Sequence, residues 1–161
     1  DSPAKNPTYT VVVKGANSKT YDGKSAVVKV YVITDYGNDN VKTEVKSFRT
    51  AANAGKYTAN FNGQKVYYTI KQAKNVVSVT KNKTYTKKQL KKKGKSFQIK
   101  TKSKNKGKVT YKSSSKYVKV SKKGKVTISK KAKKGTYKIK VTVAAKGNYG
   151  KCVKYIKIRV K

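Results

Sequence analysis

Apolar residues alternate with lysine, threonine or arginine along much of this chain. The longest alternating runs are residues 137–145 (YKIKVTVAA) and 155–160 (YIKIRV). A repeat of two residues matches an extended strand, in which successive side chains point to opposite faces. Each run can therefore bury one face in a core and leave a lysine-bearing face in water. This patterning predicts folded β-sheet, although the high charge and low hydrophobicity of the chain would by themselves permit disorder.

In the first half, the pattern predicts strands over residues 9–14, 26–33, 44–48, 56–61 and 65–72. We expect a turn over residues 16–23 and a loop over residues 35–40, because Asp, Asn and Gly favour such conformations. Within the turn, Tyr21-Asp22-Gly23 is interpreted as a tight turn rather than a binding loop. The dipeptide Asn62-Gly63 joins the last two strands and is a strong signal for a hairpin.

The second half shows shorter strands, marked by apolar pairs that flank one polar residue. These pairs are Phe97/Ile99, Val109/Tyr111, Val118/Val120 and Val126/Ile128, and the turns between strands contain Gly107, Gly124, Gly135 and Gly147. About seven strands with turns every 8–12 residues or so are typical of a β-sandwich. Residues 86–90 do not alternate, and they fit either one helical turn or a basic loop.

The chain of 161 residues is long enough for two small domains. The last acidic residue is Glu44, and the density of lysine rises near residues 73–77. We therefore predict one module over residues 1–75 and a second over residues 76–161. The expected fold class is all-β, with two small β-sandwich modules in tandem.

Lysine dominates the charge of the chain. Of its 43 basic residues 41 are lysine, and the net charge is +38. Residues 75–161 contain 31 basic and no acidic residues, whereas residues 1–74 contain 12 basic and 5 acidic ones. This asymmetry, +31 against +7, indicates an anionic polymer or surface as partner. Because arginine is preferred for bidentate base recognition, its near absence argues against sequence-specific nucleic-acid binding.

Three clusters of lysine are the candidate polyanion-binding residues. The first is the densest run, the second alternates with other residues, and the third precedes Gly135. Together they comprise Lys87, Lys88, Lys91, Lys92, Lys93 and Lys95; Lys102, Lys104, Lys106 and Lys108; and Lys130, Lys131, Lys133 and Lys134. The alternative interpretation is a solvated exterior that only keeps the protein soluble.

Catalytic and metal-binding residues are scarce. The chain has no His and no Met, and Cys152 is its only cysteine. It therefore has no intrachain disulfide, no paired-cysteine metal site and no nucleophile with an imidazole base. The Asp and Asn residues of the 35–40 loop lack the spacing of a calcium-binding loop. We predict no catalytic residues, no metal site and no cofactor, and we interpret Cys152 as a small, partly buried residue.

The second half resembles the bacterial Ig-like group 2 repeat. The resemblance rests on the tyrosine-containing strand at Tyr111, the serines 113–115, the strand 118–120, and a glycine turn at Gly124 followed by another strand. A further glycine precedes the long strand that begins near residue 137, as in the family. Members of the family usually mix acidic residues among the lysines, and this chain has none there. The resemblance implies an Ig-like sandwich.

The first half resembles the YDG or MBG type of bacterial surface repeat. Tyr21-Asp22-Gly23, the later residues 53–57 (NAGKY) and the strand 67–71 (YYTIK) carry this resemblance. Such repeats are also small β modules found in tandem in adhesin-like proteins.

These observations predict a non-catalytic extracellular module of a Gram-positive cell-surface protein. It would act as a stalk or adhesin and bind anionic cell-wall or host polymers, such as teichoic acid or acidic or sulfated glycans. The alternative is a module that recognises a specific host or bacterial surface protein. No apolar run approaches the roughly 18 residues of a membrane span, so we expect no membrane insertion. We also expect a monomer within a longer, multi-domain chain, with export and anchoring signals outside these residues.

Overall fold

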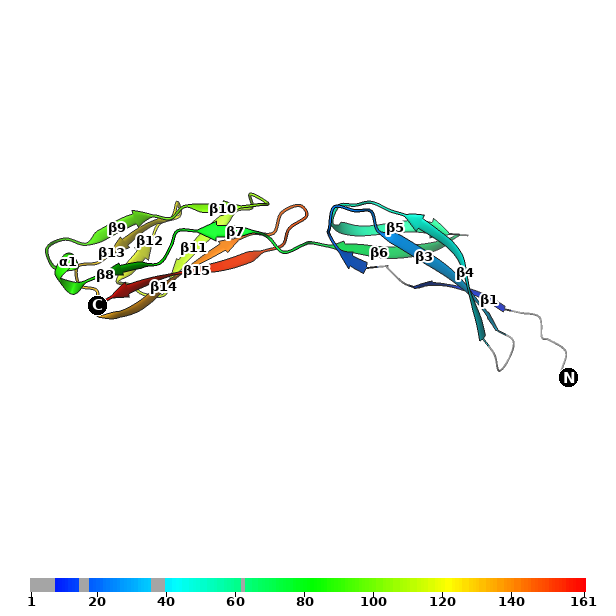
Figure 1. Cartoon of the computed structure of the whole chain (residues 1–161), viewed down its shortest axis with the longest axis horizontal. Helices are drawn as coiled ribbons and strands as arrows, with labels where there is room; N and C mark the ends of the chain where they lie inside the picture. The colour runs from blue at the N-terminus through cyan, green and yellow to red at the C-terminus, as the bar shows by residue number, and fades with distance from the viewer. Residues whose placement is uncertain (1–7, 15–17, 36–39, 62) are drawn as a thin grey trace. The chain divides into compact units, whose positions relative to one another are not determined.

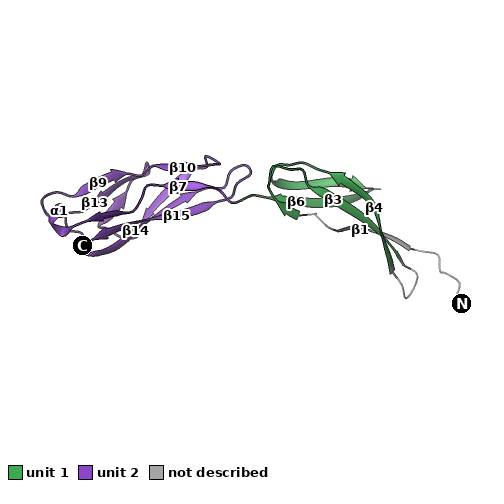
Figure 2. Ribbon diagram, viewed as in Figure 1, with its two compact units in different colours: residues 1–73 green, residues 74–161 purple. Residues whose placement is uncertain are grey.

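The computed structural model describes residues 8–14, 18–35, 40–61 and 63–161 (Figure 1). Fifteen strands and one short helix make up the regular structure of these residues, so the prediction of an all-β fold is confirmed. The chain divides into two compact units, residues 1–73 and 74–161, which we call unit 1 and unit 2 (Figure 2). The division lies two residues before the predicted boundary.

Unit 1 contains two three-stranded sheets. One has the order β1-β3-β4 and is antiparallel throughout; its strands are β1 (Thr8–Lys14), β3 (Val27–Asp35) and β4 (Asn40–Arg49). The other has the order β2-β6-β5, with β2 parallel to β6; its strands are β2 (Ser18–Thr20), β5 (Gly55–Phe61) and β6 (Gln64–Lys71).

The two sheets of unit 1 share a small core. Val28 of β3 packs with Val66 and Tyr68 of β6, and Tyr68 stacks on Tyr57 with 5.1 Å between ring centroids. In β3, the alternate residues Val28 and Val30 are fully buried. A register shift follows Val30, and Val32 beyond it is only half-buried.

Two predicted connections of unit 1 differ in outcome. Gly63 has a φ of +77°, and Phe61 lies opposite Gln64, so the predicted hairpin between β5 and β6 is confirmed. The predicted turn over residues 16–23 is partly wrong, because Ser18–Thr20 forms β2. This strand has no apolar alternation and exists because its backbone pairs with β6. Residues 36–39 of the predicted loop, with Asn38 and Asp39, lie outside the described residues.

Unit 2 contains two larger sheets and one two-stranded sheet. The first has the order β11-β14-β15-β8, with strands β11 (Val109–Ser113), β14 (Gly135–Val143), β15 (Cys152–Val160) and β8 (Lys83–Tyr85). The second has the order β12-β13-β9, with strands β12 (Val118–Val120), β13 (Lys125–Ile128) and β9 (Lys95–Gln98). The two-stranded sheet pairs β7 (Val77–Val79) with β10 (Thr101–Ser103).

The core of unit 2 lies between its two larger sheets. Ile139 and Ile156 of the first sheet are fully buried, as are Val118, Val126 and Ile128 of the second. These are the apolar positions that the alternating pattern assigned to one face. The predicted strand over residues 137–145 is two residues too long, because β14 ends at Val143.

Helix α1 (Lys87–Lys92) settles the alternative left open for residues 86–90. Thr86 is its N-cap: the Gln89 backbone N–H donates to Thr86 Oγ1 at 3.1 Å, and the Thr86 N–H donates to Gln89 Oε1 at 2.7 Å. This reciprocal capping box satisfies two backbone donors that a helix start would leave unpaired. Leu90 is fully buried in the core of unit 2 and fixes the helix to the sandwich.

Candidate polyanion-binding surface

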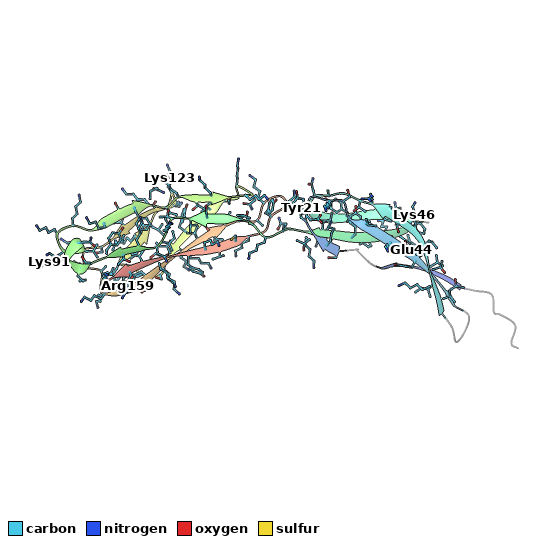
Figure 3. All side chains as sticks on the ribbon, in the orientation of Figure 1. Tyr21, Glu44, Lys46, Lys91, Lys123 and Arg159 are labelled. Atoms are coloured by element: carbon cyan, nitrogen blue, oxygen red, sulfur yellow. The ribbon has the colours of Figure 1, made fainter. Side chains whose placement is uncertain are left out.

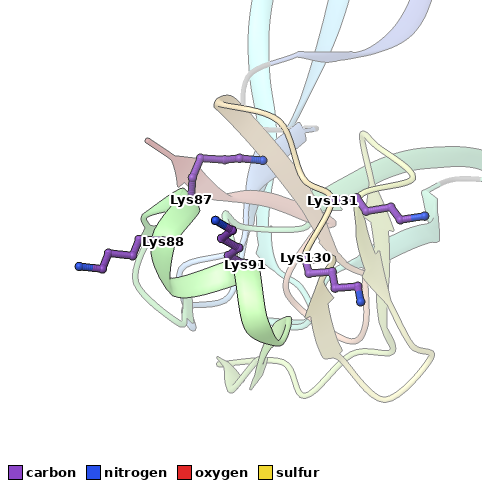
Figure 4. A pocket seen from close by; sticks show the side chains of 5 residues that line it. All are labelled: Lys87, Lys88, Lys91, Lys130 and Lys131. Atoms are coloured by element: carbon purple, nitrogen blue, oxygen red, sulfur yellow. The ribbon is translucent and has the colours of Figure 1, made fainter.

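Five lysines from two distant segments of the sequence surround one open hollow in unit 2. Lys87, Lys88 and Lys91 come from α1, and Lys130 and Lys131 come from the connection between β13 and β14. The hollow has a volume of about 720 Å³. We call it the lysine hollow. Figure 4 shows the five side chains that line it. The fold thus unites the first and third lysine clusters predicted from the sequence.

One hydrogen bond links the two walls of the lysine hollow, and others hold each wall in place. Lys87 Nζ donates to the Ala132 carbonyl at 2.7 Å, and the Lys87 backbone N–H donates to the Lys161 carbonyl at 2.8 Å. On the opposite wall, the Ala132 N–H donates to the Ser129 carbonyl at 3.0 Å. The half-buried Lys87 therefore has a structural role, whereas the side chains of Lys88, Lys91, Lys130 and Lys131 are exposed.

The remaining predicted lysines fall into two groups. Near the hollow, five exposed lysines lie on the segments that leave its two walls. They are Lys92, Lys93 and Lys95, between the end of α1 and the start of β9, and Lys133 and Lys134, on the connection to β14. The second predicted cluster is separate. It consists of Lys102 in β10 and of Lys104, Lys106 and Lys108 in the loop after β10. This loop lies at the end of unit 2 opposite to α1 (Figure 1).

Unit 2 offers its lysines no acidic partner. Two ion pairs occur among the described residues, and both belong to unit 1: Lys19–Asp22 at 2.7 Å and Lys29–Glu44 at 3.7 Å. Figure 3 shows long side chains projecting along the whole length of unit 2, with Lys91, Lys123 and Arg159 on different parts of it. The ammonium groups therefore repel one another and attract anions from solution.

The Tyr21-Asp22-Gly23 segment forms a turn, as the interpretation from sequence expected. Asp22 Oδ1 accepts hydrogen bonds from the Lys24 backbone N–H at 2.9 Å and from Lys19 Nζ at 2.7 Å. Gly23 has a φ of +79°, a conformation that glycine adopts at no steric cost. The carboxylate of Asp22 thus serves the geometry of the turn.

Acidification from about pH 7 to about pH 3 should destabilise unit 1 and leave unit 2 unchanged. The pKa of Asp22 is lowered mainly by the hydrogen bond from Lys19, and the pKa of Glu44 is lowered mainly by the hydrogen bond from Ser47. A lowered folded-state pKa stabilises the fold above the unfolded-state pKa, and this contribution is lost as pH falls through the folded-state value.

No Asp, Glu or His side chain exists in residues 75–161, so none titrates in unit 2 over this range. Thermal unfolding at constant ionic strength, followed by NMR amide signals of each unit, measures the two responses separately. A melting temperature of unit 2 that falls with acidification would contradict the prediction.

The structure also reveals candidate residues that the sequence analysis did not select. Lys112, Lys138, Lys140 and Tyr155 line a shallow depression of about 300 Å³, together with Ser113 and Ser114, on the outer face of the sheet β11-β14-β15. These lysines are isolated in sequence, so a search for dense runs overlooks them. The available signal was their outward position in the strand alternation, but the strand register was needed to bring them together.

Other kinds of site are not evident in the described part of the chain. It contains no group of three or more His, Cys, Asp or Glu side chains close enough to hold a metal ion. It also contains no helix with the length and apolar character needed to cross a membrane. Cys152 is half-buried at the start of β15.

Comparison with known proteins identifies no family for the chain. No protein-family model matches it, and no curated protein matches it. Among solved structures, it is similar to a SusE-like, surface-located polysaccharide-binding protein from the heparin utilisation locus of Bacteroides thetaiotaomicron, with a TM-score of 0.35 and 10% sequence identity. The similarity covers 99% of this chain and 35% of that protein, so the chain spans about a third of its length. A similarity this low establishes neither the family nor the ligand.

Proposed function

We propose that this chain is a non-catalytic, polyanion-binding part of an extracellular protein on the surface of a Gram-positive bacterium. Unit 2 is the binding unit and unit 1 a spacer, in a stalk or adhesin that holds teichoic acid or acidic or sulfated glycans. The resemblance of the two halves to bacterial surface repeats, Ig-like group 2 and YDG/MBG, supports this setting.

The lysine hollow is the single observation that carries the proposal. Four exposed lysines, two from α1 and two from the β13–β14 connection, line it, and residues 75–161 supply no carboxylate side chain to neutralise them. An anionic group in the hollow is attracted by both walls at once. A hydrated ammonium acts as a point charge, so lysine accepts phosphate, sulfate or carboxylate without fixed geometry. A chain of such groups can continue over Lys92, Lys93, Lys133 and Lys134.

Neutralising the hollow should weaken polyanion binding at least tenfold at low salt, because fewer counterions are released on binding. The variant is K88Q/K91Q/K130Q/K131Q, which keeps Lys87 and its bond to the Ala132 carbonyl. Affinities for heparin and for purified wall teichoic acid are measured by titration across a salt series. The slope of log K against log salt should become less steep by roughly three.

A matched control removes four lysines from the β12–β13 hairpin, which lies outside the hollow: K119Q/K122Q/K123Q/K125Q. This control has the same net charge as the hollow variant and should bind the polymers several-fold more tightly than the hollow variant does. Equal losses in the two variants would contradict the hollow as the centre of binding. A wild-type chain that retains neither polymer even at very low salt would contradict the function itself.

Recognition of a specific protein predicts a different salt response. Binding to a protein surface would be saturable at one-to-one stoichiometry and would largely survive moderate salt, unlike counterion-driven association. A partner that meets both criteria, with polymers failing to compete, would favour this alternative.

A further inference from the structure

Tyr155 exposes an aromatic ring on the lysine-bearing face of unit 2. It lies in the middle of β15 with 53% of its surface exposed, while Ile156 and Ile158 of the same strand are buried. Other tyrosines of unit 2, such as Tyr111 and Tyr137, are partly buried and pack against the core. Tyr155 instead points outward, so its ring is in contact with water.

Strand register places lysines directly beside this ring. Tyr155 lies opposite Lys140 of β14, and Lys140 lies opposite Lys112 of β11, which makes one row across three strands. In the neighbouring row on the same face, Lys138 lies opposite Lys157. Adjacent strands are about 4.8 Å apart, so the row from Tyr155 to Lys112 spans roughly 10 Å of backbone.

This arrangement does not stabilise the fold. Like charges directly opposite each other on a sheet are unfavourable, which applies to Lys140 with Lys112 and to Lys138 with Lys157. Elsewhere in unit 2, lysines lie over tyrosine rings, as with Lys104 Nζ at 5.2 Å from the centroid of Tyr149. Among the described residues, Tyr155 takes part in no such contact and in no ring–ring contact. Its ring face is available to a ligand.

We infer that this sheet face is a subsite for an acidic or sulfated polysaccharide. One pyranose ring stacks its C–H face on Tyr155, because the face of an aromatic ring carries partial negative charge that attracts such hydrogens. Carboxylate or sulfate groups of the same and the next sugar then lie against Lys140 and Lys112. The inference rests on the proposed function and names the class of polymer that unit 2 selects.

Charge density favours a polysaccharide over a nucleic acid. Four lysines, Lys112, Lys138, Lys140 and Lys157, surround a single stacking ring. A sulfated sugar chain carries several anionic groups per disaccharide, whereas a nucleic-acid strand carries one phosphate per base. A polyphosphate has the charge but no ring to stack. The combination of one ring with four ammonium groups fits the polysaccharide best.

The test compares three polyanions on the intact chain: a heparin oligosaccharide, linear polyphosphate and single-stranded DNA. Tyr155→Ala should lower the affinity for the heparin oligosaccharide about fivefold, the scale of one aromatic stacking contact. Because no charge is removed, the salt slope should stay the same, and the affinity for polyphosphate should not change. Tyr155→Phe keeps the ring and should bind as the wild type does.

Two further variants fix the location of the subsite. Tyr67→Ala removes another highly exposed tyrosine, 66% exposed in unit 1, and should leave heparin affinity unchanged. K112T/K140T should lower heparin affinity and make the salt slope less steep by roughly two.

Three outcomes would overturn the inference. They are an unchanged heparin affinity of Tyr155→Ala, an equal loss of polyphosphate affinity in that variant, and a loss confined to single-stranded DNA. Each of them leaves the proposed function intact as long as the wild type still binds polyanions. Failure of the wild type to bind any of the three at low salt would instead refute the proposed function.

Discussion

Leu90→Ala should destabilise unit 2 by about 3 kcal/mol, the usual cost of removing a fully buried leucine side chain. Leu90 is fully buried and is the only apolar residue of α1. The helix has six residues, too few to be stable without tertiary packing. Loss of this anchor therefore releases α1 from the sandwich, and the lysine hollow loses one wall.

The consequence for binding follows from that release. Leu90→Ala keeps every charge of unit 2, yet it should lower heparin affinity toward that of the hollow variant. Denaturant unfolding followed by NMR signals of unit 2 gives the stability, and heparin titration gives the affinity. Lys92→Ala is the control: its side chain is exposed on the same helix, and its stability should change by less than about 0.5 kcal/mol. A cost below about 1 kcal/mol for Leu90→Ala would refute the assigned role of this residue.

Lowering the ionic strength from about 0.15 M to about 0.01 M should destabilise unit 2 by about 2 kcal/mol, because the Debye length rises from about 8 Å to about 30 Å. The 31 positive charges of residues 75–161 have no acidic side chain among them. Spread over the surface of a module this size, they lie on average roughly 13 Å apart. At low salt each charge repels many others, and the folded state holds them closer together than the unfolded chain does.

The melting temperature of unit 2 should accordingly fall by roughly 10 °C. Unit 1 serves as the internal control, because its residues 1–73 contain 11 basic and 5 acidic residues, a net charge of +6, and its described residues include two ion pairs. Its melting temperature should change much less. Addition of heparin at low salt should restore the stability of unit 2, since a ligand that binds only the folded state stabilises it. A melting temperature of unit 2 that is independent of salt would contradict the prediction.

Strands with a buried face were predictable from the chain itself. The alternation in residues 155–160 places Ile156, Ile158 and Val160 in the core, and the structure buries all three. The hairpin at Gly63 was predictable in the same way, because its left-handed φ depends on the type of residue at that position. The all-β class and the acid-free second half also follow directly from the order of residues.

Elements that depend on a partner elsewhere in the chain were not predictable in this way. Ser18–Thr20 is a strand only because its backbone pairs with β6. Helix α1 remained one of two alternatives, since six residues with one leucine show no amphipathic repeat. A helix forms here rather than a loop because the core of unit 2 buries Leu90.

The two candidate binding surfaces were likewise predictable in part. Sequence alone determined that lysines are abundant, that acids are absent from residues 75–161, and that the charged side chains alternate with buried ones. Only the tertiary structure decided which lysines act together. Lys91 and Lys130 line one hollow because α1 packs beside the β13–β14 connection, and Lys112, Lys140 and Tyr155 lie in one row because of strand register. The charge of each lysine follows from the residue type, whereas the grouping of lysines on one surface is set by packing between distant segments of the chain.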